Sequence, residues 1–346
     1  MTAPPLPPPL PSASTSARET LLDVAGLSVS FPTPDGSVRA VVDASFEVGR
    51  GEILGIVGES GSGKTTLLMA VARLLDAPGV RVEAERVCLG GRELQALSDR
   101  EFHRLRGAEL SVVFQDATSA LNPTATIGRQ IGETLRAHRS VSRKAATAEA
   151  VRLLELLGVP DAARRSDSYA HELSGGLRQR VMIASAIAAR PSLLLADEPT
   201  TALDVTVQAG VVDLVVGLRD ALNMAVVWIS HDLPLLATFA DRVAVMYAGR
   251  IIEVGPSQRV FDTPGHPYTV GLLESIPQVK SAAGGRLTAM PGSLPSPTDY
   301  PTGCPFADRC AFRMDVCAEM PTFRSVAPGH VAACWLLDEG RDSGDR

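Results

Sequence analysis

The chain is poor in aromatic residues and has no apolar run long enough to cross a membrane. Aromatic residues make up 4% of the 346 residues, against 45% for all hydrophobic types, so we expect a core packed mainly from aliphatic side chains. A membrane-spanning helix needs about 18 or more consecutive apolar residues, and the sequence has no such stretch. The sequence therefore predicts a protein that does not span the membrane.

The first residues lack the features of a secretory signal. Residues 1–16 are rich in proline, serine and alanine, but they have neither a basic start nor a continuous apolar centre. We expect residues 1–18 to form a disordered, proline-rich tail, and residues 338–346 to form another. Without export the five cysteines would lie in a reducing compartment, where we expect no disulfide bonds.

An excess of positive charge is missing as well. The net charge is −6, the sequence pI is about 5.6, and no part of the sequence forms a basic stripe. Proteins that hold nucleic acid through its phosphates need such a concentration of lysine and arginine. We therefore expect no nucleic-acid partner.

One segment carries a strong signal for phosphate binding. Residues 58–65 read Gly-Glu-Ser-Gly-Ser-Gly-Lys-Thr, which matches the P-loop pattern G-x-x-x-x-G-K-[ST]. An apolar, strand-like stretch (52–57) precedes it, and helical spacing of apolar residues (65–75) follows it. In this context the glycines let backbone N–H groups point at phosphate oxygens, and the helix adds its positive dipole end. We expect Lys64 to reach the β- and γ-phosphates and Thr65 to bind Mg²⁺.

A second apolar strand ends in two carboxylates. Residues 193–196 are apolar, and Asp197 and Glu198 follow directly. Behind a P-loop, the aspartate at the end of a strand is expected to hold Mg²⁺, and a carboxylate one residue later can polarise the attacking water. A Ser-Gly-Gly turn at residues 174–176 opens a long helix, which is either a second anion site or simply a helix cap.

The order of predicted elements indicates an α/β fold. Two strands (21–31 and 38–48) flank a turn at 33–36, and residues 126–190 are mainly helical. Continuous apolar runs at 192–196 and 224–229 are typical of buried parallel strands, and the helix predicted between them (204–222) completes a βαβ unit. Strands at 110–114, 243–248 and 250–254 complete the pattern. After Pro256 the sequence becomes rich in proline, glycine and serine.

Taken together, the chain resembles the ATP-binding subunits of ABC transporters. Six motifs occur in that family's order between about residues 20 and 255: the P-loop, Gln115, Leu-Ser-Gly-Gly at 173–176, Asp197-Glu198, the turn ending at Asp204, and His231. The resemblance implies a P-loop NTPase cassette with an antiparallel β subdomain and a helical subdomain. We expect the cassette at 19–257, its helical subdomain at about 115–185, and a small cysteine-containing carboxy-terminal extension at 258–337.

The resemblance also implies a role for individual residues. Catalytic roles fall on Glu198 as general base, His231 at the γ-phosphate, and Gln115 beside Mg²⁺ and the water. The expected ATP-binding residues are Phe31, Gly58, Ser60, Gly61, Ser62, Gly63, Lys64, Thr65 and Thr66. The expected Mg²⁺ ligands are Thr65, Gln115 and Asp197. The residues expected to face ATP bound to a second cassette, or to lie at the dimer seam, are Ser174, Gly175, Gly176 and Asp204. Phe31 is alternatively a core residue, and His231 a structural one.

A second resemblance narrows the branch. Residues 265–273 read Gly-His-Pro-Tyr-Thr-Val-Gly-Leu-Leu, and residues 301–310 read Pro-Thr-Gly-Cys-Pro-Phe-Ala-Asp-Arg-Cys. Both are similar to the extension of ATPases that drive oligopeptide, dipeptide and nickel import. The implied function is ATP hydrolysis that powers peptide import from the cytoplasmic face of the membrane. The implied partners are a second ATPase subunit, two transmembrane permease subunits and an extracytoplasmic solute-binding protein.

Other functions remain open at this stage. The cargo could be nickel or another small solute, because cargo contacts lie in other chains. A soluble ABC ATPase that is not tied to transport is a further alternative, although such proteins usually carry two cassettes or long coiled-coil inserts. A nucleotide-gated regulatory module is a third, against which the intact Glu198 and His231 argue.

Four cysteines gather near the carboxy-terminal end. Cys304, Cys310, Cys317 and Cys334 are spaced C-x5-C-x6-C-x16-C, which indicates a metal site but not the tight spacing of a zinc ribbon. Some members of this transporter branch are similar in carrying a [4Fe–4S] cluster there, so an iron–sulfur cluster, zinc and free thiols all stay open. Cys88 stands apart, and we expect it to be a small buried hydrophobic residue.

Overall fold

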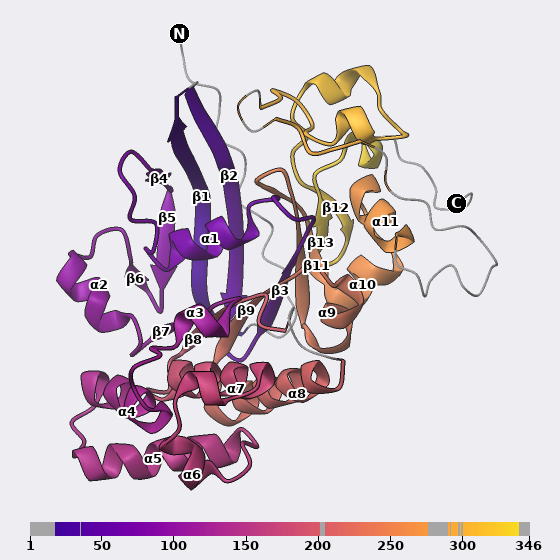
Figure 1. The fold of residues 1–346 in the computed structure, drawn as a ribbon. Coiled ribbons are helices and arrows are strands. Elements are labelled where there is room, and N and C mark those ends of the chain that lie inside the picture. The colour runs from indigo at the N-terminus through magenta and orange to yellow at the C-terminus, as the bar shows by residue number, and fades with distance from the viewer. Residues whose placement is uncertain are drawn as a thin grey trace.

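The computed structural model describes residues 18–34, 36–200, 205–275, 290, 292–296, 298 and 300–338. Figure 1 shows an antiparallel sheet at the amino-terminal side, a mostly parallel sheet at the centre, a group of helices at one end and the carboxy-terminal extension at the other. Two hydrophobic cores correspond to these parts, since one joins the antiparallel sheet to one face of the central sheet and the other joins the opposite face to the helices.

The antiparallel sheet begins with the predicted pair of strands. β1 (Thr20–Thr33) pairs with β2 (Gly36–Gly49), so the predicted hairpin is confirmed. The remaining strands of this sheet are β4 (Arg81–Glu83), β5 (Arg86–Leu89) and β6 (Arg92–Glu93), and its order is β2-β1-β5-β6 with β4 also on β1. Side chains of β1 such as Leu22, Val24 and Leu27 are buried in the core that this sheet shares with α1 and the central sheet, which explains their apolar character.

The central sheet has eight strands in the order β12-β13-β11-β10-β3-β9-β8-β7. Its parallel part comprises β7 (Leu110–Val113), β8 (Leu193–Asp197), β9 (Ala225–Ser230), β3 (Ile53–Val57) and β10 (Arg242–Tyr247). Every residue of β3, β8 and β9 is buried because helices or the other sheet cover both faces, as their continuous apolar runs predicted. The carboxyl ends of these three strands meet at one edge, where ligands bind in open α/β sheets.

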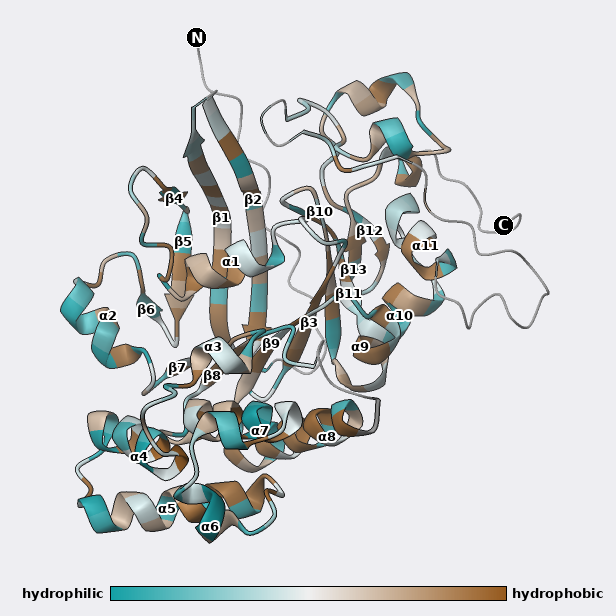
Figure 2. Cartoon of the chain, viewed as in Figure 1, coloured by the Kyte–Doolittle hydropathy of each residue, from teal (hydrophilic) through white to brown (hydrophobic). Residues whose placement is uncertain are grey.

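The helices predicted after the P-loop, within residues 126–190 and over residues 204–222 are present, and the structure adds others that the sequence pattern did not predict. Helix α1 (Lys64–Val71) follows β3, α2 (Asp99–Leu105) precedes β7, and α8 (Val205–Leu222) and α9 (Leu233–Phe239) flank β9. The helical group at the bottom of Figure 1 consists of α3 (Ala117–Ala120), α4 (Ile127–His138), α5 (Arg143–Leu156), α6 (Ala162–Ser166) and α7 (Gly175–Ile187). In Figure 2 α8 is largely brown, whereas α5, α6 and α7 mix teal with white and brown, as expected of helices that have one face on a core.

One predicted boundary is wrong. The helix expected over residues 65–75 ends at Val71, with Ala72 as its C-cap. Arg73 has φ 49°, a left-handed conformation that interrupts the helical hydrogen bonds, and its guanidinium donates to the carbonyl oxygen of Leu97 at 2.9 Å. The apolar residues at 74 and 75 instead pack against the antiparallel core.

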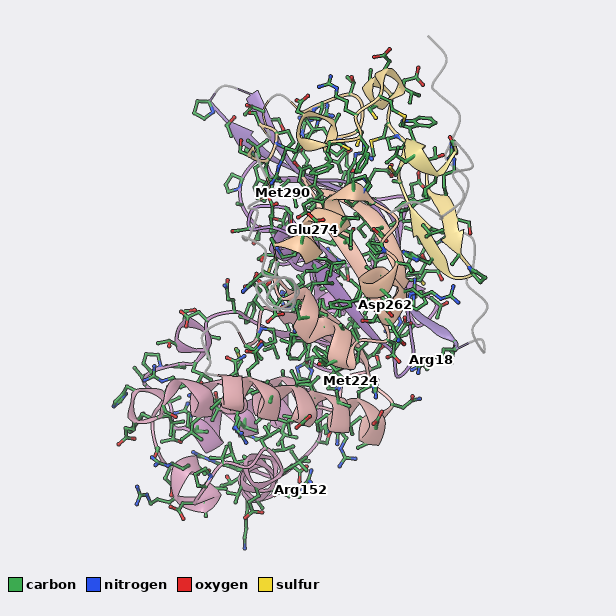
Figure 3. All side chains as sticks on the ribbon, turned by 90° about the vertical axis from the view of Figure 1, so that its right-hand side faces the viewer. Arg18, Arg152, Met224, Asp262, Glu274 and Met290 are labelled. Atoms are coloured by element: carbon green, nitrogen blue, oxygen red, sulfur yellow. The ribbon has the colours of Figure 1, made fainter. Side chains whose placement is uncertain are left out.

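The carboxy-terminal extension is joined to the cassette by strand pairing. After β11 (Arg250–Pro256) come α10 (Ser257–Asp262) and α11 (Pro267–Glu274), and later the hairpin β12 (Arg324–Ala327) and β13 (His330–Ala332). Strand β13 pairs with β11, so the extension lengthens the central sheet. Figure 3 shows the side chains packed between these segments, with Met290 beside α11, where its methyl group approaches Gly271.

A buried glutamate links the cassette to the carboxy-terminal extension through hydrogen bonds. Glu253 of β11 has no exposed surface, and its carboxylate accepts four hydrogen bonds. The donors are Gly265 N at 2.7 Å, His266 N at 3.0 Å, Thr269 Oγ1 at 2.6 Å and His330 Nε2 at 2.6 Å. All four belong to the extension, which is why a charged side chain is tolerated in this interior.

Candidate nucleotide site

The P-loop runs from β3 to α1 as the motif predicted. Gly61 (φ 81°) and Gly63 (φ 99°) have left-handed backbone conformations that favour glycine. A Cβ atom at Gly58 would collide with the carbonyl oxygen of Met246, and one at Gly63 with that of Ala40. Glycine is therefore required for shape at these positions, because the loop curls tightly against the neighbouring strands.

Lys64 points back over the loop that it follows. Its ammonium donates hydrogen bonds to the carbonyl oxygens of Gly58 at 2.8 Å and Glu59 at 2.9 Å. Burial lowers the pKa of Lys64, and the negative charges of Glu198, Asp197 and Glu59 act in the opposite direction. The ammonium is therefore fixed over the P-loop, where a lysine of this motif meets phosphate oxygens.

Asp197 and Thr65 meet at the end of β8. The Thr65 hydroxyl donates to Asp197 Oδ1 at 3.0 Å. Burial raises the pKa of Asp197, whereas the hydrogen bond from Thr65 lowers it. Hydroxyl and carboxylate oxygens are the donors that Mg²⁺ prefers, so this pair fits the cation that accompanies a nucleotide.

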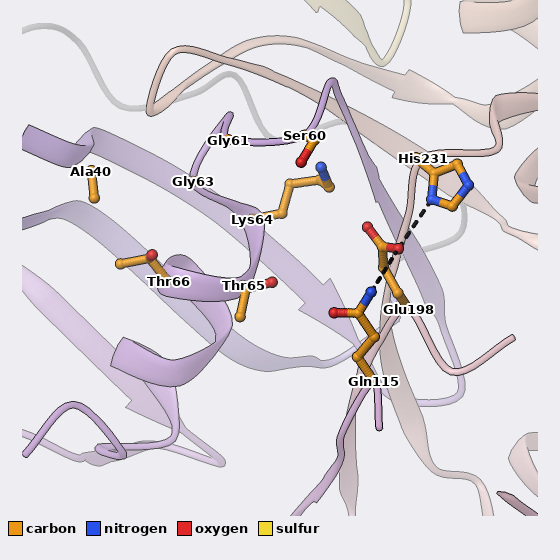
Figure 4. Close-up of a pocket in the computed structure, with 10 residues that line it drawn as sticks. All are labelled: Ala40, Ser60, Gly61, Gly63, Lys64, Thr65, Thr66, Gln115, Glu198 and His231. Carbon is orange, nitrogen blue, oxygen red and sulfur yellow. Dashed lines mark hydrogen bonds and ion pairs between the residues drawn. The ribbon is translucent and has the colours of Figure 1, made fainter. Parts of the chain in front are cut away.

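Glu198 lies between two polar side chains. Its backbone φ is 42°, a conformation that turns the side chain out of the line of β8 toward the cleft. His231 Nδ1 lies 3.0 Å from Glu198 Oε2, and Gln115 Nε2 donates to the same oxygen at 3.5 Å, as Figure 4 shows. Three residues from the ends of β7, β8 and β9 are therefore brought together although 116 positions separate the first from the last.

These groups surround a cleft of about 360 Å³. The cleft is open to solvent, and Lys64, Glu198 and His231 face one another across it in Figure 4. Its lining residues are Ala40, Ser60, Gly61, Gly63, Lys64, Thr65, Thr66, Gln115, Glu198 and His231. All except Ala40 were predicted from the sequence. Ala40 was missed because nothing in its local sequence marks it, and it lines the cleft because β2 packs closely against the P-loop at Gly63.

Three predicted ATP-binding residues do not line the cleft. Gly58 and Ser62 are buried in the body of the loop, and the carbonyl oxygen of Ser62 accepts a hydrogen bond from Gly249 N at 2.8 Å. Phe31 is half-buried on β1 and packs against the antiparallel core. Its adenine-stacking role stays a prediction.

The Ser-Gly-Gly segment lies apart from this chain's own cleft. Ser174 is the N-cap of α7 and is exposed, as is Gly175, whereas Gly176 is half-buried. Apart from its chain neighbours and the backbone of its own helix, none of the described residues has an atom within 4 Å of a Cβ built on Gly175, so the start of this helix is accessible to a large ligand or a partner. Asp204, predicted at the dimer seam, lies outside the described residues.

The four carboxy-terminal cysteines line a common small cavity. Cys304, Cys310, Cys317 and Cys334 share it with His266 and Trp335, and its volume is about 10 Å³, the space of one water molecule. Burial raises the pKa of both Cys304 and Cys334 to about 11. Within the described residues, no group of three or more His, Cys, Asp or Glu side chains is arranged to hold a metal ion. The donor types suit a soft metal, but their arrangement does not form a ligand set, and the iron–sulfur expectation is not supported.

Cys88 differs from its prediction. It lies on β5 and is only half-buried, because β5 has one face on the antiparallel core and the other toward solvent.

Among the helices of the described segments, none is long and apolar enough to span a membrane.

Comparison with known proteins finds a matching family model both for the cassette and for the carboxy-terminal extension. Residues 41–201 match the family model "ABC transporter", and residues 252–317 match "Oligopeptide/dipeptide transporter, C-terminal region". A putative peptide import ATP-binding protein of Brucella abortus is 48% identical over 314 residues, covering 91% of this chain and 94% of its own length. The oligopeptide transport ATP-binding protein OppD of Escherichia coli is 45% identical over 92% of this chain and 93% of its own length.

The solved structures agree with this result. The ATP-binding cassette MJ0796, in a dimeric post-hydrolysis state bound to ADP and phosphate, superposes with a TM-score of 0.62 at 26% identity and covers 68% of this chain and 99% of its own. The fold is thus that of a P-loop ABC cassette, and the cassette binds ATP and Mg²⁺. The chain therefore belongs to the ATP-binding subunits of ABC transporters, in the branch that carries the oligopeptide/dipeptide transporter C-terminal region, and it is an ATPase.

Proposed function

We propose that this ATPase powers the import of di- or oligopeptides, as one of two nucleotide-binding subunits on the cytoplasmic face of the membrane. The observation that carries the proposal is the match of residues 252–317 to the oligopeptide/dipeptide transporter region, together with relatives named for peptide import over more than nine tenths of the chain. The proposed partners are a second cassette, two transmembrane permease subunits and an extracytoplasmic solute-binding protein.

The cleft supports a division of labour in ATP hydrolysis. Lys64 and the P-loop N–H groups would hold the β- and γ-phosphates, and Thr65, Asp197 and Gln115 would hold Mg²⁺. Mg²⁺ neutralises the phosphate charge when bound. Glu198 accepts a proton from the attacking water, whose oxygen forms a bond to the γ-phosphorus as the bond to the bridging oxygen of ADP breaks.

His231 and Gln115 orient the base. Both approach Oε2 of Glu198, so they fix the plane of the carboxylate toward the cleft. His231 is more than half exposed, which leaves it accessible to the γ-phosphate.

The accessible start of α7 supports a role toward the partner. Ser174, Gly175 and Gly176 do not line their own cleft, and a helix N-terminus with exposed N–H groups attracts phosphate. Two cassettes arranged head to tail would each contribute this turn to the other's ATP, with Asp204 at the seam.

Domain boundaries near 19–257 and 258–337 are part of the same proposal, with the two units sharing the central sheet.

The test of the catalytic assignment is the Glu198→Gln variant. It removes the proton acceptor while it keeps the shape, so we expect ATP binding and ATP-dependent dimerisation without turnover. Glu155→Gln, an exposed substitution on α5, is the matched control and should hydrolyse ATP at the parental rate. Hydrolysis by Glu198→Gln at the parental rate would show that Glu198 is not the base.

Cargo is tested with the intact transporter. The complex is purified with its permease and binding-protein partners, placed in proteoliposomes and offered labelled dipeptides, labelled oligopeptides or nickel ions. Peptide-dependent stimulation of ATP hydrolysis and peptide uptake support the proposal. Uptake of nickel alone would favour the alternative cargo, and a chain that co-purifies with no membrane subunit would favour an ABC ATPase not tied to transport.

A metal or [4Fe–4S] group on the cysteine cluster is a separate part of the proposal. Its support is the convergence of four thiols on one cavity. Anaerobically purified protein is examined by visible absorption and metal analysis. Iron with a broad visible band indicates the cluster, zinc alone indicates a structural zinc site, and neither indicates free thiols.

A further inference from the structure

A side chain of the carboxy-terminal extension reaches directly into the P-loop. Arg309, in the 3-10 helix Ala307–Arg309, donates through Nη1 to Glu59 Oε2 at 3.0 Å and through Nη2 to Glu59 Oε1 at 3.0 Å. The two residues are 250 positions apart. The Arg309 side chain is 6% exposed and the Glu59 side chain is 29% exposed, so this two-pronged ion pair is partly shielded from water and stronger than a fully exposed pair.

The backbone of Glu59 is held from the extension as well. Its N–H group donates to the hydroxyl of Tyr268, on α11, at 2.9 Å. The Tyr268 ring is fully buried and packs against the rings of Tyr247 and Phe306. Arg309 also donates to the Tyr247 hydroxyl at 3.3 Å, so the donors and acceptors around Glu59 are themselves fixed in place.

From Glu59 the contacts continue to the phosphate-binding lysine. The carbonyl oxygen of Glu59 accepts a hydrogen bond from Lys64 Nζ at 2.9 Å and from Ser62 N at 3.2 Å. Three parts of one P-loop residue are therefore engaged: the side chain and the N–H group by the extension, and the carbonyl by the loop itself. A shift of Glu59 would therefore move the ammonium of Lys64 and the first residues of the phosphate-binding loop.

Charge gives the contact a second consequence. Glu59 places a carboxylate in a loop whose ligand carries several negative charges, and its field reaches Lys64. Without a cation beside it, this carboxylate would repel the phosphates and attract the ammonium that should bind them. Arg309 supplies that cation from outside the cassette motifs.

We propose that Arg309 is a positioning residue for ATP binding, by which the carboxy-terminal extension sets the shape and neutralises the charge of the P-loop at Glu59. The proposal rests on the cleft at Lys64 being the ATP site. It adds to the family's six motifs a residue that none of them contains. The extension then takes part in nucleotide binding.

The test compares ATP affinity and turnover in the full-length chain. Arg309→Ala should raise the Kd for ATP about tenfold, because it leaves the Glu59 carboxylate unpaired beside the phosphates. The KM for ATP should rise with it, and kcat at saturating ATP should stay within about twofold, since Glu198 and His231 are untouched. Arg309→Lys, which keeps the charge but not the two-pronged geometry, should lie between the parent and Arg309→Ala.

A double variant separates charge from general damage. Glu59→Gln combined with Arg309→Ala removes both charges and keeps the backbone contacts of residue 59 to Tyr268 and Lys64. It should recover ATP affinity to within about threefold of the parent. If Arg309 merely stabilised the extension, the double variant would bind ATP no better than Arg309→Ala, and that result would overturn the proposal.

Two further variants complete the design. Arg324→Ala removes another arginine of the extension, which pairs with Asp338 and not with the P-loop, and should leave the Kd for ATP unchanged. Lys64→Ala should abolish ATP binding. If Lys64→Ala binds ATP like the parent, the site assignment itself fails. If Lys64→Ala loses binding while Arg309→Ala stays within twofold of the parent, the positioning role of Arg309 is refuted.

Discussion

Glu253→Ala is expected to loosen the extension from the cassette. The wild-type carboxylate is fully buried and accepts hydrogen bonds from two backbone N–H groups, the Thr269 hydroxyl and His330. The alanine variant leaves all four donors without their acceptor in a dry interior. The imidazole of His330 then loses its hydrogen bond through Nε2. Its other nitrogen, Nδ1, has no hydrogen-bond partner among the described residues, so the ring would be left without any.

The magnitude follows from the number of orphaned donors. One buried polar group left unpaired costs about 1–3 kcal/mol, and Glu253→Ala leaves four such donors. Taking these together, and allowing for water entering the gap, we expect the free energy of unfolding to fall by about 4 kcal/mol. For a chain of this size that loss corresponds to a decrease in Tm of about 6 °C.

Two measurements check this expectation. Thermal unfolding gives the decrease in Tm, and limited proteolysis with mass spectrometry locates the loosened segment, which should be cut after residue 256. Glu253→Gln keeps one acceptor oxygen and should fall between the parent and Glu253→Ala. Glu83→Ala, an exposed glutamate on a strand, is the control and should change Tm by less than about 1 °C.

The outcome that refutes the reasoning is specific. If Glu253→Ala unfolds within about 1 °C of the parent and resists protease equally, the extension is held by apolar packing and the buried carboxylate adds nothing. Because Arg309 and Tyr268 reach the P-loop from the same extension, a loosened Glu253 variant should also bind ATP more weakly.

Two further predictions concern the cleft itself. Gly63→Ala should lose ATP binding and lower Tm, because its Cβ would collide with the carbonyl of Ala40 and its φ of 99° disfavours alanine. The control Gly217→Ala lies in open space on α8 and should instead stabilise the protein by up to about 1 kcal/mol. Equal changes in Tm for the two variants would contradict the steric argument. Asp197→Asn should abolish the rise in Tm that MgATP gives while leaving the ligand-free Tm at pH 7.5 no lower than the parent's. Burial raises the pKa of Asp197, so stability falls as pH rises from the ordinary carboxyl pKa through the raised pKa of the folded state, and this loss is complete above it. A marked loss of ligand-free stability in Asp197→Asn would contradict this sign.

Much of the cleft was predictable because its residues sit in motifs of local geometry. The glycines of the P-loop and the carboxylates that end β8 follow from backbone sterics and the strand they terminate. His231 could be placed because it follows a continuous apolar strand, and parallel strands end at one edge of a sheet. Helix α1 ended earlier than its apolar spacing predicted, since Arg73 takes a left-handed conformation and donates to a carbonyl of a distant loop.

The sequence by itself determined the cassette, its phosphate loop, the order of its strands and the chemistry at their ends, because these depend on short stretches of chain whose steric and hydrophobic preferences act locally. Only the tertiary structure decided that Glu253 lies at the centre of four donors, that four thiols share one cavity, and that Arg309 pairs with Glu59. Such contacts join residues up to 250 positions apart, and they form only after the sheets and helices have packed. No local preference in the chain encodes them, since the energy that selects them comes from burial and charge pairing in the finished interior.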